Sequence, residues 1–226
     1  MCEILAVATS SPKRLDEVIR WAEKLEHYGI AGFGWGVAWL EGDQVRGYRN
    51  ADRLSADREY HNRFGHVTST RYLVHLRRPS RLDTVQLQDT QPFVADGRFA
   101  FCHNGRFKND ARYRQAYSDQ LDGRADSEVG FRIFEELLGK SLDPDAALRR
   151  THLKLGGTAN LGYLSAAGEL LMLSAFPGNQ MWRFRMGDAE IVSTELHSAD
   201  DSLFTLVFPD SIERRRLTGV EAIAPS

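Results

Sequence analysis

The second residue of the chain is a cysteine, and its position gives it two distinct uses. Cys2 stands directly before the mostly apolar stretch 3–8. A free cysteine in such a place is commonly a small buried apolar residue. Alternatively, removal of Met1, which happens before a small second side chain, leaves one residue with both a thiol and an α-amine. The neutral amine, with a reference pKa of about 8, can then take the thiol proton and activate the sulfur as a nucleophile.

A second candidate lies in the segment FCHNGRFKN over residues 101–109. Asn-Gly is a strong signal for a tight hairpin turn, which is the simplest interpretation of Asn104 and Gly105. The residues after the pair favour the start of a helix rather than a returning strand. The side-chain amide of Asn104 and the backbone N–H of Gly105 also form a pair of neighbouring donors. Two donors aimed at one point can stabilise a tetrahedral oxyanion.

Two further segments carry charges suited to an amino-acid head group. HLRR (75–78) ends a predicted strand, where an arginine is usually solvated or ion-paired, although a guanidinium can also hold a carboxylate in a bidentate fashion. ADSE (125–128) opens a predicted helix, where Asp and Ser are usually capping residues. An Asp that is not used up in capping can instead bind an ammonium group. Each of these segments alone leaves both interpretations open.

In combination, the segments resemble a known family. Met1-Cys2, HLRRPS, DTQPF (89–93), FCHNGRFKN and ADSE are similar, in order and in approximate spacing, to motifs of the class II glutamine amidotransferases. These enzymes are N-terminal nucleophile hydrolases. The tripeptide GWG (34–36) is similar to a further element of the family, and the resemblance extends over nearly the whole chain.

The resemblance implies a role for each matching position. Cys2 would attack the side-chain amide of glutamine with its own α-amine as base, and Asn104 and Gly105 would form the oxyanion hole. Arg77 would hold the α-carboxylate of the substrate, and Asp126 its α-ammonium. A hydroxyl residue that touches substrate falls at Ser80. The family needs no cofactor for this chemistry, so none is expected here.

The chain departs from the family pattern beside the predicted arginine. Pro79 stands where the family usually has a small residue, and Arg78 is a second arginine next to the expected one. These departures leave open which of the two arginines faces the substrate.

The elements that must position these residues follow from the hydrophobic pattern. We expect an α+β protein, and the resemblance implies the four-layer αββα sandwich of the N-terminal nucleophile hydrolases. A charged, irregular segment over 51–66 is expected to be a long surface loop near the site. Predicted strands cover residues 3–8, 32–40, 44–50, 71–78 and 98–105, with more short strands from 158 to 208; predicted helices cover 11–28 (Ser11 as cap, Pro12 first), 109–117, 126–139 and 143–155.

Composition narrows the class of protein. The chain of 226 residues is 42% hydrophobic and 27% charged with a net charge of −2, so neither nucleic acid nor an anionic membrane surface is an expected partner. We expect a single domain over residues 1–226. Two cysteines make no disulfide framework, and with no signal peptide or membrane span in the sequence we expect a cytoplasmic protein. His61, His66 and His75 match no standard metal-ligand spacing, so no metal is expected.

Three functions are consistent with the sequence. The first is hydrolysis of glutamine, with the ammonia passing to a separate synthase partner, because we expect no fused synthase after residue 208. The second is hydrolysis of a larger γ-glutamyl compound, as in the short family members that act in ergothioneine synthesis. The third is a non-catalytic module that senses glutamine or glutamate. The presence of every expected site residue favours an enzyme over a sensor.

Overall fold

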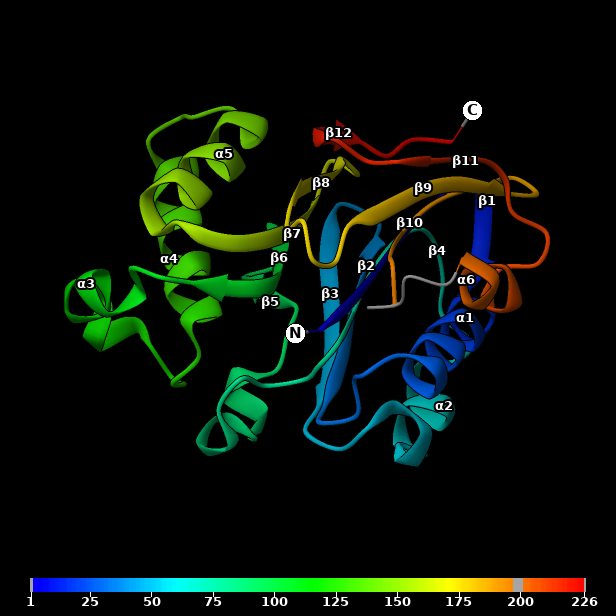
Figure 1. Cartoon of the computed structure of the whole chain (residues 1–226), viewed down its shortest axis with the longest axis horizontal. Coiled ribbons are helices and arrows are strands. Elements are labelled where there is room, and N and C mark those ends of the chain that lie inside the picture. The colour runs from blue at the N-terminus through cyan, green and yellow to red at the C-terminus, as the bar shows by residue number, and fades with distance from the viewer. Residues whose placement is uncertain (1, 197–200, 226) are drawn as a thin grey trace.

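Two antiparallel β-sheets packed face to face organise the molecule (Figure 1), which was analysed as a computed structural model that describes residues 2–196 and 201–225. The seven-stranded sheet has the order β11-β9-β10-β1-β4-β2-β3, and the five-stranded sheet the order β12-β8-β7-β6-β5. The strands are β1 (Glu3–Arg14), β2 (Trp35–Glu41), β3 (Gln44–Asn50), β4 (Thr68–Leu76), β5 (Phe93–Ala95), β6 (Phe99–Phe107), β7 (Gly157–Ser165), β8 (Leu170–Ala175), β9 (Met181–Met186), β10 (Ala189–Thr194), β11 (Ile212–Arg216) and β12 (Gly219–Ala222).

Helices cover the outer face of each sheet, which gives the four-layer αββα sandwich predicted from the sequence. On the seven-stranded sheet, α1 packs against β1 and β4, and α6 packs against α1. On the five-stranded sheet, α4 lies over β5 and β6, while α5 lies over β7 and β8. The helices are α1 (Leu15–Tyr28), α2 (Glu59–Phe64), α3 (Asp110–Arg114), α4 (Asp126–Gly139), α5 (Pro144–Leu155) and α6 (Asp201–Val207).

The alternation of side chains along β1 explains how one strand serves two apolar layers. Successive side chains of a strand point to opposite faces. Leu5 and Val7 therefore join the cluster beneath α1, while Ile4, Ala6 and Ala8 join the layer between the sheets. A strand buried on both faces is a continuous apolar run, which is what residues 4–8 show.

The start of the first helix differs from its prediction. Ser11 and Pro12 were expected to begin the helix, but β1 continues to Arg14 and α1 begins at Leu15. After an irregularity in the pairing, Lys13 and Arg14 lie opposite Ser69 and Thr68 of β4. The pairing with β4 therefore extends the strand past the local capping signal. The predicted end is confirmed, because α1 ends at Tyr28 with Gly29 as its C-cap.

The segment 51–66 is also different from its prediction as a loop near the site. It contains a short 3-10 helix (Leu54–Ala56) and α2, and it lies beside α1. The carboxylate of Glu26 on α1 accepts hydrogen bonds from the backbone N–H groups of Leu54 and Ser55 at 2.7 and 2.9 Å. The Asp57 carboxylate accepts from the Trp35 indole at 3.0 Å. This segment therefore covers the outer face of the seven-stranded sheet.

The two helices expected at residues 126–139 and 143–155 are confirmed. α4 spans Asp126–Gly139, and α5 begins at Pro144 behind Asp143, whose side chain accepts hydrogen bonds from the backbone N–H groups of residues 145 and 146. No helix among the described residues is long and apolar enough to cross a membrane. The prediction of one domain over residues 1–226 stays a prediction.

Candidate active site

Cys2 lies at the start of β1, between the two sheets, and is held at three atoms. Its backbone N–H donates to Oδ1 of Asn104 at 2.7 Å, and its carbonyl accepts from Nδ2 of Asn179 at 3.3 Å. Its Sγ accepts from the backbone N–H of Arg78 at 3.3 Å. These bonds reach from three distant parts of the chain, so the thiol has a fixed position. Met1 lies outside the described residues, and its predicted removal stays a prediction.

Burial raises the pKa of the Cys2 thiol, while the N–H of Arg78 and the charge of Arg77 act in the opposite direction. The resting group is therefore the thiol, not the thiolate. A thiol in this environment needs a base to act as a nucleophile at neutral pH.

Asn104 lies inside β6, directly opposite Asn160 of β7, so it is not part of a hairpin turn. Ala100 and Cys102 on the same strand face the layer between the sheets, and the alternation of side chains turns Asn104 the same way, toward Cys2. Its Oδ1 is occupied by the N–H of Cys2. Its Nδ2 is buried and has no hydrogen-bond partner among the described residues. A buried donor without a partner is costly and typical of a functional site.

Gly105 follows in β6 with a φ of 146°, in the range that side-chain-bearing residues rarely adopt. A Cβ atom at this position would stand 2.1 Å from the carbonyl oxygen of Thr158 on β7. Only glycine therefore fits here without movement of the backbone. The residue lines the pocket next to Cys2.

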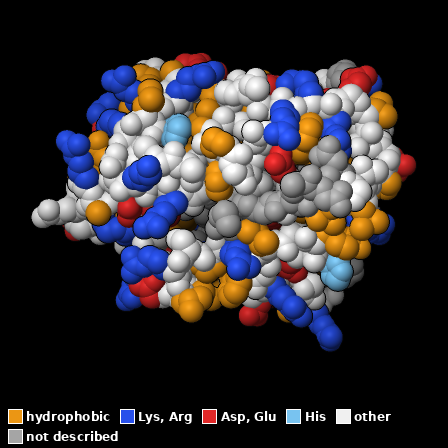
Figure 2. Space-filling model, in the orientation of Figure 1, with side chains coloured by type: hydrophobic (Ala, Val, Ile, Leu, Met, Phe, Trp, Pro, Cys, Tyr) orange, Lys and Arg blue, Asp and Glu red, His pale blue; other side chains and the backbone are white. Residues whose placement is uncertain are grey.

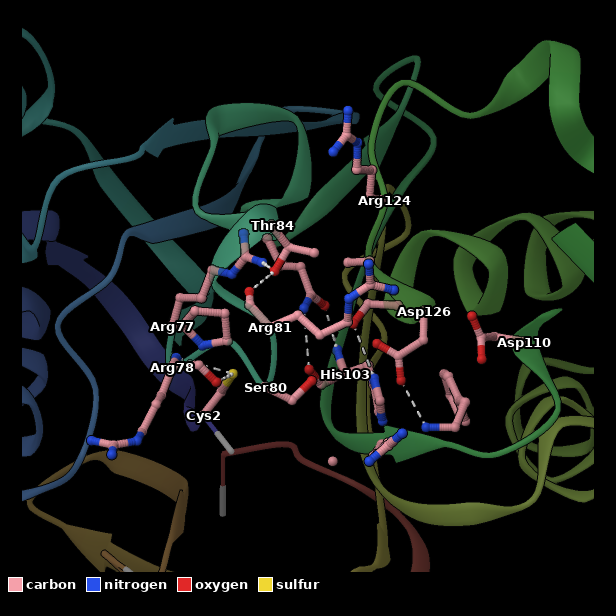
Figure 3. A pocket seen from close by; sticks show the side chains of 17 residues that line it. Cys2, Arg77, Arg78, Ser80, Arg81, Thr84, His103, Asp110, Arg124 and Asp126 are labelled. Carbon is pink, nitrogen blue, oxygen red and sulfur yellow. Dashed lines mark hydrogen bonds between the residues drawn. The ribbon is translucent and has the colours of Figure 1, made fainter.

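Arg77 follows the last residue of β4 and is 3% exposed. Its backbone N–H donates to the carbonyl of Gly34 at 2.8 Å, and its guanidinium donates to Oγ1 of Thr84 at 2.9 Å. Arg78 is exposed, and its guanidinium donates to the carbonyl of Ile30 at 3.0 Å, away from the pocket in Figure 3. Of the two neighbouring arginines, Arg77 therefore has the buried guanidinium in the pocket wall.

Asp126 is the first residue of α4, but it does not cap the helix, because the N-cap residue is Ala125. One carboxylate oxygen of Asp126 accepts from the backbone N–H of Phe107 at 2.7 Å, and the other accepts no hydrogen bond from a described residue. Figure 3 shows Asp126 across the pocket from Arg77 and Cys2. An anion and a cation thus stand on opposite sides of one cavity.

The structure brings the predicted site residues to one pocket with a volume of about 140 Å³. Cys2, Arg77, Ser80, Gly105 and Asp126 all line it. Asn104 lies behind Cys2 and reaches the site through its amide. None of the described residues of the segment 51–66 lines this pocket.

Sequence reasoning missed three buried polar residues that hold the site in place. Asp89 accepts from the backbone N–H groups of Arg124 and Ala125, each at 2.6 Å, and so fixes the chain just before Asp126. Gln91 accepts from the backbone N–H of His103 at 2.7 Å. The segment DTQPF that contains Asp89 and Gln91 was recognised as a motif, but the sequence gives no sign of what these side chains bind.

The third missed residue is His103, which is 1% exposed and stacks on Phe107 with a centroid distance of 3.9 Å. Its Nε2 lies 3.3 Å from the carbonyl of Thr158, and its Nδ1 lies 3.1 Å from Oγ of Ser127. Burial lowers the pKa of His103, so the ring is neutral. Nε2–H therefore donates to Thr158, and Nδ1 accepts from Ser127, which ties β6 to α4.

The described residues contain no group of three or more His, Cys, Asp or Glu that could hold a metal ion. His75 is fully buried and burial lowers its pKa to about 3, whereas His66 is exposed. Nε2 of His75 lies 3.2 Å from the carbonyl of His103 and donates to it. This histidine therefore links β4, which leads directly into Arg77, to β6, which carries Asn104.

Comparison with known proteins assigns the family. The model of the family described as "Glutamine amidotransferases class-II" matches residues 1–197. The chain belongs to this family.

Among characterised relatives, the glutamine--fructose-6-phosphate aminotransferase (isomerizing) of Bacillus licheniformis is 31% identical over 147 residues. The match covers 62% of this chain and 23% of that protein, so the chain spans about a quarter of the length of the relative it matches.

Solved structures show the same fold. The glutamine phosphoribosylpyrophosphate amidotransferase of B. subtilis aligns with a TM-score of 0.72 at 15% identity, over 98% of this chain and 48% of that one. A glutamine aminotransferase class-II domain protein from Silicibacter pomeroyi aligns over 100% of both chains, with a TM-score of 0.61 and 19% identity. The sandwich of this chain is therefore of the N-terminal nucleophile hydrolase type.

Proposed function

We propose that this protein hydrolyses the γ-glutamyl amide bond of glutamine or of a larger γ-glutamyl compound, with Cys2 as an N-terminal nucleophile. The observation that carries the proposal is the Asn104 amide, whose Oδ1 holds the Cys2 N–H at 2.7 Å while its Nδ2 is buried and unpaired among the described residues. One side chain thus serves the nucleophile and leaves a donor beside it. Such a donor can bind the oxygen of the attacked carbonyl.

The amino-acid head of the substrate is fixed by two charges. The guanidinium of Arg77 binds the α-carboxylate, the carboxylate of Asp126 binds the α-ammonium, and Ser80 contacts the head from the loop after β4. Fixing the head at one end of the pocket places the γ-carbonyl at Cys2. Orientation of this kind can lower a barrier by about 7–11 kcal/mol.

The reaction proceeds through a thioester. Once Met1 is removed, the neutral α-amine of Cys2 takes the thiol proton, and the thiolate adds to the γ-carbonyl carbon. Nδ2 of Asn104 and the N–H of Gly105 stabilise the oxyanion, a contribution of about 3–4 kcal/mol for each donor. The C–N bond breaks, and the leaving ammonia or amine takes the proton from the α-ammonium.

Water then resolves the γ-glutamyl thioester. The α-amine accepts a proton from the water as its oxygen adds to the carbonyl, and the C–S bond breaks. The proton returns to the sulfur, and glutamate leaves. No cofactor takes part in this sequence of steps.

Two substitutions of cysteine test the proposal. Cys2→Ala should lower glutamate release from every γ-glutamyl amide that the wild type cleaves by at least about a thousandfold, because the nucleophile is lost. Thermal stability should change little, since one sulfur atom is removed. The matched control is Cys102→Ala, which removes the buried thiol of β6 in the layer between the sheets and should retain activity. Full activity of the Cys2→Ala variant would contradict the proposal.

A panel of substrates separates the remaining alternatives. Release of glutamate from glutamine alone would favour a subunit that supplies ammonia to a synthase partner. Release from larger γ-glutamyl amides would favour a free-standing hydrolase. Binding of glutamine without release of glutamate from any amide would favour the sensor and overturn the proposal.

A further inference from the structure

The charges that line the pocket are strongly unbalanced. Seven residues with charged side chains contribute to its lining, and five of them are arginines: Arg77, Arg78, Arg81, Arg106 and Arg124, against Asp110 and Asp126. Arg78 contributes without its guanidinium, which turns toward Ile30. A glutamate head group carries one carboxylate and one ammonium, so it adds no net charge. Binding of a glutamine head group therefore leaves the excess positive charge of the pocket unneutralised.

Some of this excess is neutralised by neighbours at the rim. The Arg81 guanidinium forms a paired contact with the carboxylate of Asp83 at 3.0 and 2.5 Å. Arg124 lies 4.0 Å from the same carboxylate. Because one aspartate serves both arginines, the rim of the pocket stays positive. Figure 2 shows Lys and Arg side chains gathered to the left of the centre of this face, near β5 and β6.

Arg106 differs from the other arginines that line the pocket. It directly follows Gly105 in β6, and its backbone N–H is held by Oγ1 of Thr158 at 3.2 Å. Its side chain is exposed and makes no hydrogen bond or ion pair with any described residue. An unpaired guanidinium therefore stands one residue from the proposed oxyanion hole.

Arg78 adjoins the nucleophile through its backbone rather than through its charge. Its backbone N–H contacts Sγ of Cys2 at 3.3 Å, so the residue is adjacent to the thiol although its guanidinium turns toward Ile30. The charge of Arg78 therefore points away from the pocket, which leaves Arg106 as a pocket arginine whose guanidinium is open to a ligand.

We propose that the amine half of the natural substrate carries an anionic group, such as a carboxylate, and that Arg106 binds it. This inference rests on the proposed hydrolysis and names its substrate class: γ-glutamyl amides of acidic amines, which include γ-glutamyl amino acids and peptides. The anion takes no part in bond breaking. The amine still leaves with one proton from the α-ammonium, and the guanidinium holds its anionic group until release.

The chemistry of arginine supports this choice of ligand. The guanidinium is always charged and presents paired N–H donors that match the two oxygens of a carboxylate. Ammonia, the group that leaves glutamine, has no pair of acceptor atoms to which the guanidinium could donate. A positive rim also steers anionic substrates toward the pocket, an effect that salt screens.

A matched pair of substrates tests the inference, namely γ-glutamylglycine and its neutral analogue γ-glutamylglycinamide. They differ only in a carboxylate against a carboxamide on the leaving amine. The wild type should have a kcat/KM at least about threefold higher for γ-glutamylglycine, as expected for an ion pair open to solvent, and added salt should reduce this ratio. Equal kcat/KM values at low salt would overturn the inference.

The variant Arg106→Gln assigns the preference to one residue. It should lower kcat/KM for γ-glutamylglycine at least about threefold more than for γ-glutamylglycinamide. The control is Arg20→Gln, which changes an exposed arginine on α1 outside the pocket and should leave the ratio unchanged. Equal loss on both substrates in the Arg106→Gln variant would contradict a role for Arg106 in binding the anion.

Failure of the inference differs from failure of the proposed function. Cleavage of glutamine and of both test substrates with equal kcat/KM would retain the hydrolase and reject the anionic subsite. No glutamate from any of the three would reject both.

Discussion

At the scale of single residues, the amide of Asn104 joins two tasks that are usually separate. Its oxygen fixes the backbone of Cys2, and this contact determines the direction of its NH₂ group. Because the oxygen faces the Cys2 N–H, the NH₂ group points away from that N–H on the other branch of the planar amide, where it is buried without a partner among the described residues. A substrate carbonyl that enters beside Sγ supplies the missing acceptor.

Glu3, the neighbour of Cys2, is fully buried and accepts a hydrogen bond from the hydroxyl of Thr194. Burial raises the pKa of Glu3 to about 7, although the hydrogen bond from Thr194 acts in the opposite direction. The carboxyl group is therefore mostly protonated below neutral pH in the folded protein, whereas it ionises near its ordinary value when the chain unfolds.

This shift predicts a pH-dependent difference between the wild type and Glu3→Gln. The folded-state pKa lies above the unfolded value of 4.5, so the contribution of Glu3 to stability is complete below that pH and is lost as pH rises through about 7. Relative to the variant, the wild type should lose up to about 3 kcal/mol in its free energy of unfolding over this range. Urea unfolding of both proteins at several pH values measures the difference. A difference that is constant with pH would exclude the shifted pKa.

At the scale of elements, β6 carries both proposed oxyanion donors, and the alternation of its side chains connects the two sides of the site. On one face of β6, Cys102 joins the layer between the sheets and Asn104 points the same way, toward Cys2. On the other face, Phe101 and Phe107 join the apolar cluster under α4, and His103 contacts Ser127 on that helix. The strand therefore links the nucleophile on one side to the helix that carries Asp126 on the other. A shift of one residue in its pairing with β7 would exchange the two faces.

The fit of Gly105 between β6 and β7 gives a second prediction. Gly105→Ala should lower kcat for glutamate release by about a hundredfold or more, because the Cβ atom would stand 2.1 Å from the carbonyl of Thr158 and displace the N–H donor. The melting temperature should also fall. Gly139→Ala is the control, since a Cβ atom there meets nothing within 4 Å and the substitution is expected to be neutral or slightly stabilising. Unchanged turnover of the Gly105→Ala variant would show that the N–H of Gly105 is not an oxyanion donor.

The elements also show what the sequence could and could not predict. α4 and α5 have strong periodicity and end signals, and both predicted spans are confirmed. The Ser11-Pro12 signal failed because pairing with β4, distant in sequence, extends β1 to Arg14. Asn104-Gly105 carries a hairpin signal but lies inside a strand, since β7 lies opposite both residues. Local signals thus predicted local structure and failed where a distant strand decides the conformation.

At the scale of the whole molecule, the site lies where the apolar layer between the sheets gives way to buried amides. Ala6, Ala100 and Cys102 belong to the apolar layer. Toward the start of β1, the buried residues become Asn104, Asn160 and Asn179. Cys2 stands at this boundary, with Asn104 on the five-stranded sheet and Asn179 in the loop before β9. Packing of the two sheets therefore assembles the site.

Much of the candidate site was also predictable from the sequence, but through resemblance to a family rather than through hydrophobic periodicity. Cys2, Arg77, Ser80, Asn104, Gly105 and Asp126 were assigned by resemblance to a family, and the structure brings them together. Their chemical roles stay predictions. Asp89, Gln91 and His103 were missed, because their importance lies in hydrogen bonds to backbone groups that a sequence does not display.

The most direct test of the central claim is covalent labelling of the nucleophile, followed by mass spectrometry of the intact protein and its peptides. 6-Diazo-5-oxo-L-norleucine has the head group of glutamine and a diazoketone in place of the amide. When the diazo carbon takes up the proton released by the thiol, the thiolate displaces dinitrogen and forms a C–S bond. We predict one equivalent of adduct on Cys2 in a peptide that has lost Met1, and a loss of activity in proportion to the labelled fraction of the protein. Adduct on Cys102, or full activity in a protein that retains Met1, would contradict the account.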